Sequence, residues 1–506
     1  MKFEPEELAA NANPVVIQAI QEGQEQAEWR PLFRHPCHFG PDIFGGVMSN
    51  LIHNPNINSS WLFRADILHD APDPQANSTL PIPIPSFRGF ELRRCILRRL
   101  IPRNTRRDKP LDQTCLIFEA ASSHSKDDSQ TLVVYLPHVS APSDMPFYHP
   151  VVRGIAFLHE WNPAKYCGFI SISYLYFSDY DNSELKLSRT AFRLLEVIHK
   201  HGKGRLAGYQ KRVLHDQVVP QARAQDTYHR LKLQYARGLI DGWAESTDPE
   251  KHVFEDLSIA AFLIELWADM YGKDLFPGFV DIGCGNGLLV YILNKEGYAG
   301  WGFDARSRKS WANYNTKLQT PFGEQDTLQQ KVMLPPPVSR EGLTDISDDL
   351  LDESLIHDGR FPKDTFIISN HADELTPWTP IVAAISQCPF MAIPCCSHNL
   401  TGDRFRAPAP KEKGKAESAY SSLVAWVAGI AKDCGWEVEQ EVLRIPSTRN
   451  IALIGRRQSK QDTPVDFNAV VNKYGGAAGY WNNVAKLIAA ARTTDEPDEH
   501  EHSNGA

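Results

Sequence analysis

A glycine-rich turn is the part of this 506-residue chain whose residue types and spacing point most directly to chemistry. An apolar run at 279–282 leads into the turn, and an apolar helical pattern follows at 288–294. The turn contains Asp281, Gly283, Gly285, Asn286 and Gly287. Glycines let a backbone approach a ligand closely, and amides at the start of a helix face the same ligand. The spacing GxGxG with a preceding acid, unlike the GxGxxG of dinucleotide-binding folds, favours a ligand that carries an ammonium beside its carboxylate.

A second acid, Asp304, follows Asp281 by 23 residues at the end of the next apolar run. An acid in this place can accept hydrogen bonds from both ribose hydroxyls of a nucleoside cofactor. The alternative is a structural glycine turn with an incidental acid. The chain has strand, turn, helix, strand and acid in this order. Over residues 277–457 it resembles the class I S-adenosylmethionine-dependent methyltransferases. The resemblance implies that S-adenosylmethionine binds to the glycine turn and to Asp304.

Three further segments lie at the ends of predicted strands, where ligands of parallel sheets bind. They are SNHADELTPW at 369–378, IPCC at 393–396 and RIPSTR at 444–449. With the glycine turn, they resemble the eukaryotic tRNA (uracil-2'-O-)-methyltransferases that act on uridine 44 of serine tRNAs. The similarity extends upstream through residues 218–223 and 248–256. The resemblance implies transfer of a methyl group to a ribose 2'-hydroxyl, with tRNA, and specifically serine tRNA, as the partner.

Polar side chains in the segment 369–378 are the candidates for the chemistry itself. A ribose hydroxyl is a poor nucleophile, so transfer requires the acceptor oxygen in line with the methyl donor and gains from a general base. Asp373 and Glu374 are candidate bases, His371 is a candidate base or positioning group, and Asn370 is assigned to the cofactor. The alternative for each is a helix cap or an ion pair. The Lys-Asp-Lys-Glu set of many ribose methyltransferases cannot be placed, so the catalytic base is unassigned.

The cysteines do not form a recognisable metal site. The nine cysteines include no CxxC pair, so we expect reduced thiols. Cys395, Cys396 and His398 are close in sequence, but a tetrahedral zinc site needs four ligands and no partner pair has suitable spacing. We therefore expect no metal. A cysteine nucleophile, as in methylation of a base carbon, is an alternative, and the resemblance to ribose methylation argues against it.

The elements that position these residues alternate between strand and helix downstream of residue 276. This pattern predicts a parallel sheet with helical crossovers and a closing antiparallel pair of strands. The predicted strands cover residues 279–282, 299–303, 365–369, 390–394, 437–445 and 450–456. We expect an α/β fold, a Rossmann-like class I methyltransferase domain, at residues 276–458.

The rest of the chain has a different pattern. Runs rich in β-branched and aromatic residues between 90 and 177 predict an antiparallel sheet, whereas residues 5–85, interrupted by Pro and Asn, are predicted as mostly loop and short helix. We predict an N-terminal α+β domain, a candidate for RNA binding, at residues 1–204. A helical connector is predicted at 205–275, and a helical, acidic tail at 459–506.

The net charge of −9 speaks against a polyanionic partner until the charges are sorted by position. Residues 341–358 contain seven acids and residues 495–501 contain five, neither with Lys or Arg, so the rest of the chain carries a net charge of +3. Arginines are the candidate phosphate contacts, because the guanidinium matches phosphate geometry. They are Arg93, Arg94, Arg98, Arg99, Arg404, Arg406, Arg444 and Arg449. The alternative is a solvated edge of a core element.

The sequence also bears on location and on competing functions. No apolar run approaches the roughly 20 residues that cross a bilayer, and the acidic first residues do not resemble a signal peptide. We expect a cytoplasmic protein without a membrane partner. Two alternatives stay open: a methyltransferase for another RNA or a protein, and a catalytically inactive methyltransferase-like RNA-binding subunit. The sequence identifies no accessory protein.

Overall fold

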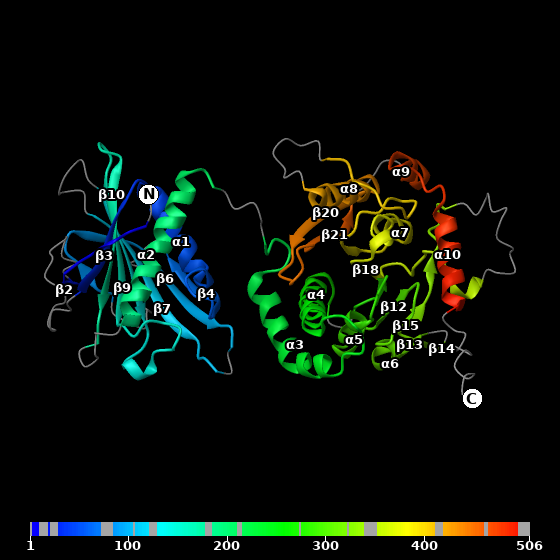
Figure 1. Ribbon diagram of the computed structural model, residues 1–506, viewed down its shortest axis with the longest axis horizontal. Coiled ribbons are helices and arrows are strands. Elements are labelled where there is room, and N and C mark those ends of the chain that lie inside the picture. The colour runs from blue at the N-terminus through cyan, green and yellow to red at the C-terminus, as the bar shows by residue number, and fades with distance from the viewer. Residues whose placement is uncertain are drawn as a thin grey trace, which may run out of the picture. The chain divides into compact units, whose positions relative to one another are not determined.

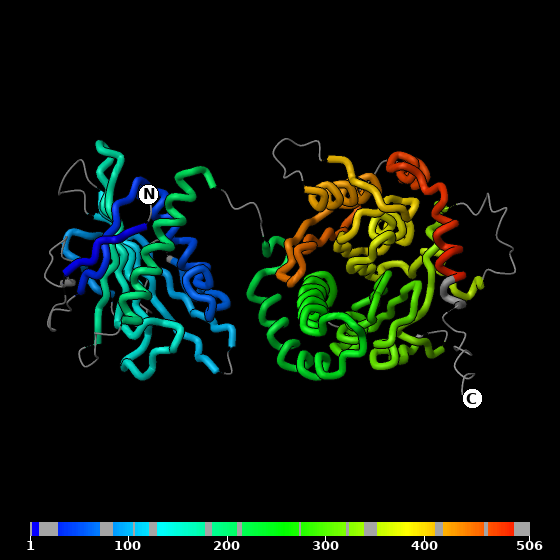
Figure 2. Tube along the Cα trace, viewed as in Figure 1, coloured from blue at the N-terminus to red at the C-terminus, as the bar shows by residue number. Residues whose placement is uncertain are grey.

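A computed structural model divides the chain into two units, residues 1–211 and 212–506, whose traces Figure 2 shows. Each unit has a main sheet of its own. The structure describes residues 3–9, 19–20, 29–71, 84–104, 107–120, 129–177, 185–209, 215–272, 275–320, 323–338, 352–409, 418–459 and 464–493. None of the described helices is long and apolar enough to cross a membrane.

The first unit is an antiparallel sheet with helices against one face (Figure 1). Its elements are β1 (Glu6–Glu7), β2 (Ala19–Ile20), β3 (Trp29–Cys37), α1 (Pro41–His53), η1 (Pro55–Ile57), β4 (Leu62–Ala71), β5 (Ser86–Phe87), β6 (Phe90–Pro102), β7 (Leu111–Ala120), β8 (Ser129–Pro137), η3 (Pro142–Asp144), β9 (Gly154–Asn162), β10 (Cys167–Leu175) and α2 (Leu185–Leu206). The main sheet has the order β1-β3-β10-β9-β8-β7-β6-β4. Along β8, Val133 and Tyr135 pack under α1 and α2, while Leu132 and Val134 join a second core on the other face. The predicted antiparallel sheet is confirmed.

Residues 29–71 contain regular structure that the sequence analysis missed. Strands β3 and β4 and helix α1 lie where mostly loop and short helix were predicted, so that prediction is wrong. Pro31 reads as a strand breaker, yet it stands at a bulge, where the register of β3 against β10 shifts between Ile172 and Ser173. A bulge tolerates the missing amide of proline. Long-range pairing with β10 therefore forms this strand despite its composition.

Arg98 of β6 ties the end of helix α1 to the sheet. Its guanidinium donates hydrogen bonds to the carbonyl oxygens of Leu51 (3.2 Å) and Ile52 (2.5 Å) and to Gln113 Oε1 (2.6 and 3.0 Å). The last carbonyls of a helix have no partner within the helix, and here Arg98, only 3% exposed, satisfies two of them inside the core. This corrects its prediction as an RNA contact, because a buried guanidinium cannot reach phosphate.

The second unit is built on a seven-stranded sheet with helices on both faces (Figure 1). Its strands are β11 (Phe279–Ile282), β12 (Gly300–Asp304), β15 (Leu328–Gln330), β18 (Phe366–Asn370), β19 (Phe390–Ile393), β20 (Trp436–Val442) and β21 (Ile451–Gln458). The order is β15-β12-β11-β18-β19-β21-β20, and β21 is antiparallel to both its neighbours whereas the other pairs are parallel. All six predicted strands occur. Strand β15, with one leucine and two glutamines, has no apolar pattern and was missed.

Helices cover the two faces of this sheet with separate cores. The helices are α3 (Gln221–Asp241), α4 (Pro249–Met270), α5 (Leu288–Lys295), α6 (Trp311–Tyr314), α7 (Thr379–Ser386), α8 (Ala419–Asp433), α9 (Phe467–Lys473) and α10 (Tyr480–Thr493). Along β18, Phe366 and Ile368 join the core with α4 and α5, and Ile367 joins the core with α7 and α8. The minor elements are β13 (Lys317–Thr320), β14 (Gly323–Asp326), β16 (Val332–Met333), β17 (Ile356–His357), η5 (Glu353–Leu355) and η6 (Asp373–Leu375).

A buried carboxylate fixes the start of the second unit. Glu441 of β20, 3% exposed, accepts hydrogen bonds of 2.7 to 2.9 Å from the backbone amides of Asp216, Gln217 and Val218. Helices α3 and α4, which follow this loop, belong to the second unit. The domain boundaries given in the sequence analysis stay a prediction, and residues 341–351 and 495–501 of the two acidic stretches lie outside the described residues.

We expect Arg98→Ala to destabilise the first unit by at least about 2 kcal/mol, because it leaves two helix carbonyls and Gln113 without a partner in the core. Hydrogen exchange of peptides from β6 and β7 in the full chain measures this local free energy. Arg99→Ala is the matched control, since Arg99 is 46% exposed and its surface ion pair with Asp112 contributes less than about 1 kcal/mol. Equal losses for the two variants would contradict the structural role.

Candidate active site

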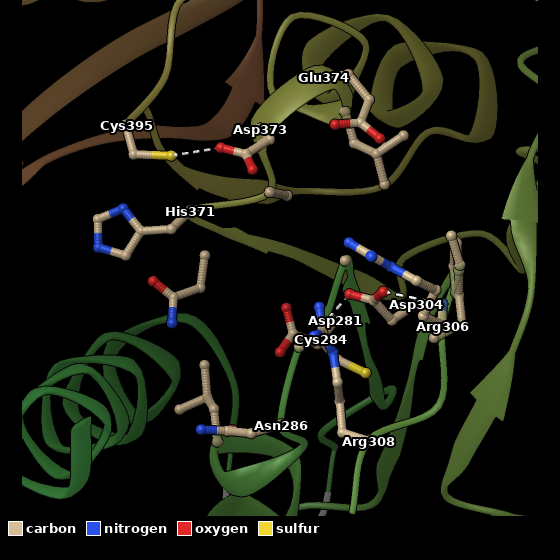
Figure 3. Close-up of a pocket in the computed structure, with 18 of the residues that line it drawn as sticks. Asp281, Cys284, Asn286, Asp304, Arg306, Arg308, His371, Asp373, Glu374 and Cys395 are labelled. Carbon is tan, nitrogen blue, oxygen red and sulfur yellow. Dashed lines mark hydrogen bonds between the residues drawn. The ribbon is translucent and has the colours of Figure 1, made fainter. Parts of the chain in front are cut away.

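A cavity of about 490 Å³ lies in the second unit where β11, β12 and β18 end (Figure 3). Ligands of parallel α/β sheets bind at the carboxyl ends of the strands, since the loops that follow them leave a crevice there. The predicted site residues that line it are Asp281, Gly283, Gly285, Asn286, Asp304, Asn370, His371, Asp373, Glu374 and Arg449. The tertiary structure therefore brings residues from three parts of the sequence to one place.

The glycine turn depends on left-handed backbone conformations. Gly283, Gly285 and Gly287 have φ values of 72°, 54° and 77°, a region that favours glycine. A Cβ at Gly287 would lie 2.4 Å from Leu328 of β15, whereas a Cβ at Gly285 would meet nothing within 4 Å. Gly287 thus lets the turn pack against the sheet, and Gly285 leaves room for a ligand.

Residues that the sequence analysis did not select hold this turn in place. Ser310 Oγ donates to the Asn286 carbonyl at 2.8 Å, and Trp311 Nε1 donates to the Gly285 carbonyl at 2.9 Å. The Asn286 side chain accepts from the Leu288 amide at 2.9 Å at the start of α5. The Asn286 side chain therefore helps to shape the turn directly before the helix, whose N-cap is Gly287.

Asp304 connects the end of β12 to the glycine turn. Its two carboxylate oxygens accept hydrogen bonds of 3.1 Å from the Gly285 and Arg306 amides (Figure 3). An ionised carboxylate has about four acceptor positions, so it keeps capacity for hydroxyl donors. Both the fixed orientation and the spare capacity agree with the predicted contact to a cofactor ribose.

Three buried acids line the cavity. Asp281 is 1% exposed, and Glu255 and Asp256 of α4 are 7% and 8% exposed. Burial, together with the neighbouring charge of Glu255, raises the pKa of Asp256 to about 8, against the opposing effect of a hydrogen bond from Asn370. Burial, with the charges of Asp256 and Asp304, also raises the pKa of Asp281 well above its usual range. These groups oppose one another unless a cation joins them.

Two buried acceptors show what such a ligand has to supply. Asp281 Oδ1 and Asn370 Oδ1 have no hydrogen-bond partner among the described residues. A buried acceptor without a donor costs free energy that a ligand donor recovers. The ammonium of S-adenosylmethionine carries three donors and a positive charge, and Asp304 remains able to accept from ribose hydroxyls. The residues present therefore fit this cofactor.

His371 lies at the same edge of the sheet, paired with an acid from α4. Its Nε2 lies 3.0 Å from Glu255 Oε1, and its Nδ1 is buried without a partner among the described residues. His371 and Asp373 have φ values of 55° and 42°, which are rare for residues with a Cβ. Strained backbone is commonly retained at functional sites. The strain therefore supports the selection of both residues from the sequence.

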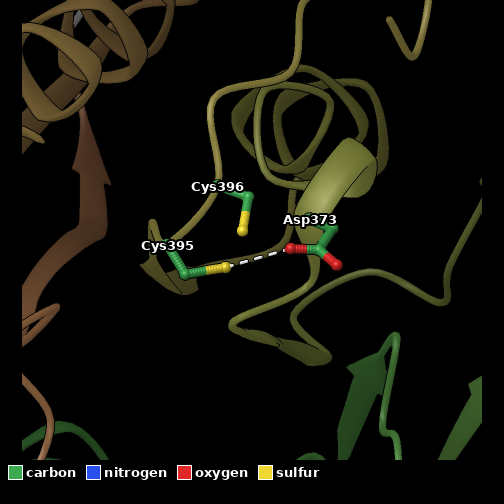
Figure 4. A group of neighbouring side chains, drawn as sticks. All are labelled: Asp373, Cys395 and Cys396. Carbon is green, nitrogen blue, oxygen red and sulfur yellow. Dashed lines mark hydrogen bonds between the residues drawn. The ribbon is translucent and has the colours of Figure 1, made fainter. Parts of the chain in front are cut away.

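Asp373 faces two thiols after β19 (Figure 4). Cys395 Sγ donates to Asp373 Oδ1 at 3.2 Å, and one ligand atom each from Asp373, Cys395 and Cys396 lies within 4.8 Å of the others. Burial, reinforced by the Asp373 carboxylate, raises the pKa of Cys395 well above its usual range. A protonated thiol is neither a nucleophile nor a metal ligand, and this group offers three of the four ligands of a tetrahedral zinc site. In this arrangement the thiol orients Asp373.

The arginines predicted to bind RNA have different surroundings. Near the cavity, the Arg449 guanidinium lies 4.7 Å from the ring centre of Tyr420, and Arg444 forms a two-bond ion pair with Asp216 (2.6 and 3.1 Å). Arg404 and Arg406 are exposed in the loop after β19.

In the first unit, Arg94 pairs with Asp70, Arg99 with Asp112, and Arg93 with both Glu91 and Glu119. Phosphate would have to compete with these carboxylates.

Several residues that line the cavity were not predicted from the sequence. Glu255 and Asp256 are two adjacent acids directly before the long apolar run of α4, a signal that could have been read. Four cations also lie at the cavity, Lys251, Arg306, Arg308 and Lys331. Arg306 and Arg308 directly follow the selected Asp304, whereas only the fold brings Lys251 and Lys331 there.

Comparison with known proteins agrees with this geometry. Residues 6–212 match the model described as "TRM44-like, N-terminal bet v1-like domain", and residues 218–335 match "Predicted AdoMet-dependent methyltransferase". A Neurospora crassa protein named tRNA (uracil-O(2)-)-methyltransferase is 62% identical, with 99% of this chain and 100% of the relative covered. The chain belongs to the tRNA (uracil-O(2)-)-methyltransferase family. The predicted family and the predicted S-adenosylmethionine-dependent methyltransferase domain are thus confirmed.

More distant relatives of the same name extend over most of the chain. The Schizosaccharomyces pombe protein is 40% identical, covering 92% of this chain and 94% of its own length. The Saccharomyces cerevisiae protein is 37% identical, covering 89% and 91%. No solved structure matches this chain. The similarity therefore includes the first unit as well as the methyltransferase domain.

The raised pKa of Asp256 predicts how stability depends on pH. The folded chain keeps this proton up to about pH 8, whereas the unfolded chain releases it near pH 4. The stabilisation is therefore lost as pH rises between these values, and we expect the free energy of unfolding of the second unit to fall from pH 5 to pH 8.5. Asp256→Asn should reduce this fall, and Asp241→Asn, at a side chain 70% exposed, should not. Urea unfolding with pulse labelling of second-unit peptides measures it, and identical slopes for both variants would contradict the prediction.

Proposed function

We propose that this protein transfers a methyl group from S-adenosylmethionine to the 2'-hydroxyl of a uridine in tRNA. The observation that carries the proposal is that the glycine turn, Asp304 and His371 line one cavity, in a chain related over nearly its whole length to a protein named tRNA (uracil-O(2)-)-methyltransferase. The finer assignment to uridine 44 of serine tRNA rests on the sequence resemblance. A cytoplasmic location and activity without a metal are also part of the proposal, and they rest on the sequence patterns and the spacing of the cysteines.

The order of the strands also supports a finer description of the catalytic domain. Five parallel strands from β15 to β19 are followed by β21, which is antiparallel both to β19 and to the edge strand β20. We assign the domain to the Rossmann-like class I methyltransferases, whose closing antiparallel pair was expected from the sequence. Under this assignment the cavity lies where parallel strands end, which is where such sheets bind ligands.

Each acid has a separate task toward the cofactor. When bound, S-adenosylmethionine supplies a methyl group on a positively charged sulfur. Asp281 and Asn370 offer the unpartnered oxygens that accept from the ammonium, and Asp304 accepts from the ribose hydroxyls. Two amides already orient Asp304, so it loses little freedom on binding. Glycine at 285 leaves room for close approach.

We assign proton acceptance to His371, with Glu255 as its positioning residue. When Nε2–H donates to Glu255, Nδ1 remains as the acceptor. A 2'-hydroxyl that donates to Nδ1 would satisfy a buried group that otherwise has no partner. The imidazolium formed as the proton leaves the hydroxyl would be stabilised by Glu255. Asp373, held by the Cys395 thiol, faces the same cavity and positions the acceptor ribose.

Methylation of defined transcripts tests the function. We expect the full chain to place one methyl group on the ribose of uridine 44 in serine tRNA, detected by mass spectrometry of nuclease fragments. A transcript with 2'-deoxyuridine at that position should receive none. Asp304→Ala should weaken cofactor binding at least about tenfold in calorimetry, because a charged hydrogen-bond acceptor is lost. Methylation that persists on the deoxy transcript would place the methyl on the base and contradict the proposal.

Variants of the cavity test the assignment of the base. We expect His371→Gln to lower kcat about 100-fold or more, and Glu255→Gln to lower it less while shifting the pH–rate profile, because the neutral amide no longer stabilises the imidazolium. Calorimetry should show cofactor binding retained in both. Asp373→Ala should also retain binding and lose turnover, by less than His371→Gln. A larger loss for Asp373→Ala would move the base to Asp373, and full turnover in all three would exclude this site.

A further inference from the structure

Two exposed aromatic rings stand together on the first unit. Trp61, directly before β4, is 47% exposed, and Phe147, after η3, is 44% exposed. Their ring centres lie 4.8 Å apart with an interplanar angle of 82°, an edge-to-face contact. Large rings are normally among the more buried side chains. Here two segments that are far apart in the sequence hold a pair of rings at the surface.

Two cations from other segments lie over these rings. The Arg107 guanidinium is 5.6 Å from the centre of Trp61 and 5.3 Å from that of Phe147, and Lys186 Nζ is 5.6 Å from Phe147. Arg107 comes from the segment between β6 and β7, and Lys186 from the first turn of α2. We call these four residues the Trp61–Phe147 surface. Four separate parts of the unit thus meet to combine exposed rings with positive charge.

The two cations of this surface have almost no contact with carboxylates. The Arg107 side chain is 60% exposed, and the carboxylate of Asp108 lies 3.8 Å from its Nε, beyond hydrogen-bond distance. Lys186 has no ion-pair partner in the described part of the chain. In contrast, Arg94 and Arg99 each form two hydrogen bonds to one carboxylate, at 2.6 to 2.9 Å. The surface, and not the strand rich in arginine, offers cations to a polyanion.

A second ring and cation of the same unit provide a comparison. Phe169 is 37% exposed, and the Arg34 guanidinium lies 3.8 Å from its ring centre. Arg34 also forms a 2.7 Å ion pair with Glu160, so its charge is neutralised. This pair has the same kinds of side chain as the Trp61–Phe147 surface without the net positive charge.

We propose that the Trp61–Phe147 surface binds an unpaired nucleotide of the RNA substrate. A base stacks on an exposed ring, and Arg107 and Lys186 contact the adjoining phosphates. Unpaired RNA is recognised in this way, by aromatic stacking together with cations along the backbone. An apolar protein partner would bury both cations without a counter-charge, which is unfavourable. The inference rests on the proposed function, because it takes tRNA as the substrate.

Binding of tRNA to the full chain tests the proposal. We expect Trp61→Ala and Phe147→Ala to raise the Kd for a serine tRNA transcript at least about fivefold, measured by fluorescence anisotropy at fixed salt. Arg107→Glu and Lys186→Glu keep both rings and should weaken binding by a similar factor, with a shallower salt dependence. Cofactor binding and turnover at saturating tRNA should be unchanged, since none of these residues lines the cavity. Phe169→Ala is the matched control and should leave the Kd within about twofold.

The possible outcomes separate this inference from the proposed function. If the unmodified chain neither binds nor methylates tRNA, the proposed function fails. If it methylates tRNA and the four variants bind tRNA as the unmodified chain does, this inference alone is overturned, and a protein partner becomes the explanation for the exposed rings. Weakened binding in the charge-reversal variants, with unchanged thermal unfolding, supports the surface even where a ring substitution impairs folding. An equal loss in Phe169→Ala would overturn it.

Discussion

The burial of uncompensated carboxylates at the end of β11 is the constraint around which the catalytic unit is arranged. Asp281 is almost fully enclosed because its strand has parallel neighbours on both sides. Asp256 lies beside it, and no Lys or Arg side chain forms an ion pair with either acid among the described residues. Buried charge without a partner is strongly unfavourable, which raises the pKa of both acids. A site of this kind is poised for a cation.

The surrounding elements satisfy this constraint and also shape the cavity. The amide of Asn370 serves Asp256, which leaves its own carbonyl oxygen free. Left-handed residues after β11 and β18 turn the chain sharply at the edge of the sheet, so that Asp281 and His371 face the same space. Glu255 and Asp256 are adjacent in sequence but have different partners, His371 and Asn370. One turn of α4 thereby links the cofactor side of the cavity to the acceptor side.

The two units show that counting cations is a poor guide to RNA contact. The arginine-rich strand β6 uses one arginine to complete the end of a helix and pairs others with carboxylates of neighbouring strands. Cations outside such pairs lie beside exposed rings, at the cavity, and in the loop after β19, where Arg404 and Arg406 are exposed. Pairing across a sheet decides which charges remain for a ligand. Side chains that are directly opposed, such as Arg99 and Asp112, or diagonal, such as Arg94 and Asp70, lie close enough to bond.

The family, six strands of the catalytic sheet and the acids of the cofactor turn could all be predicted from the order of the residues. These signals are local: a glycine turn between an apolar run and a helix has few other uses, and the acid after the next strand follows at a short interval. The contacts between distant segments, in contrast, follow only from the fold. Glu255 meets His371 across 116 positions of the chain, Pro31 is accommodated by a bulge against β10, and Arg98 is buried under α1. Such contacts depend on register and packing between distant segments, which residue types and spacing do not encode locally.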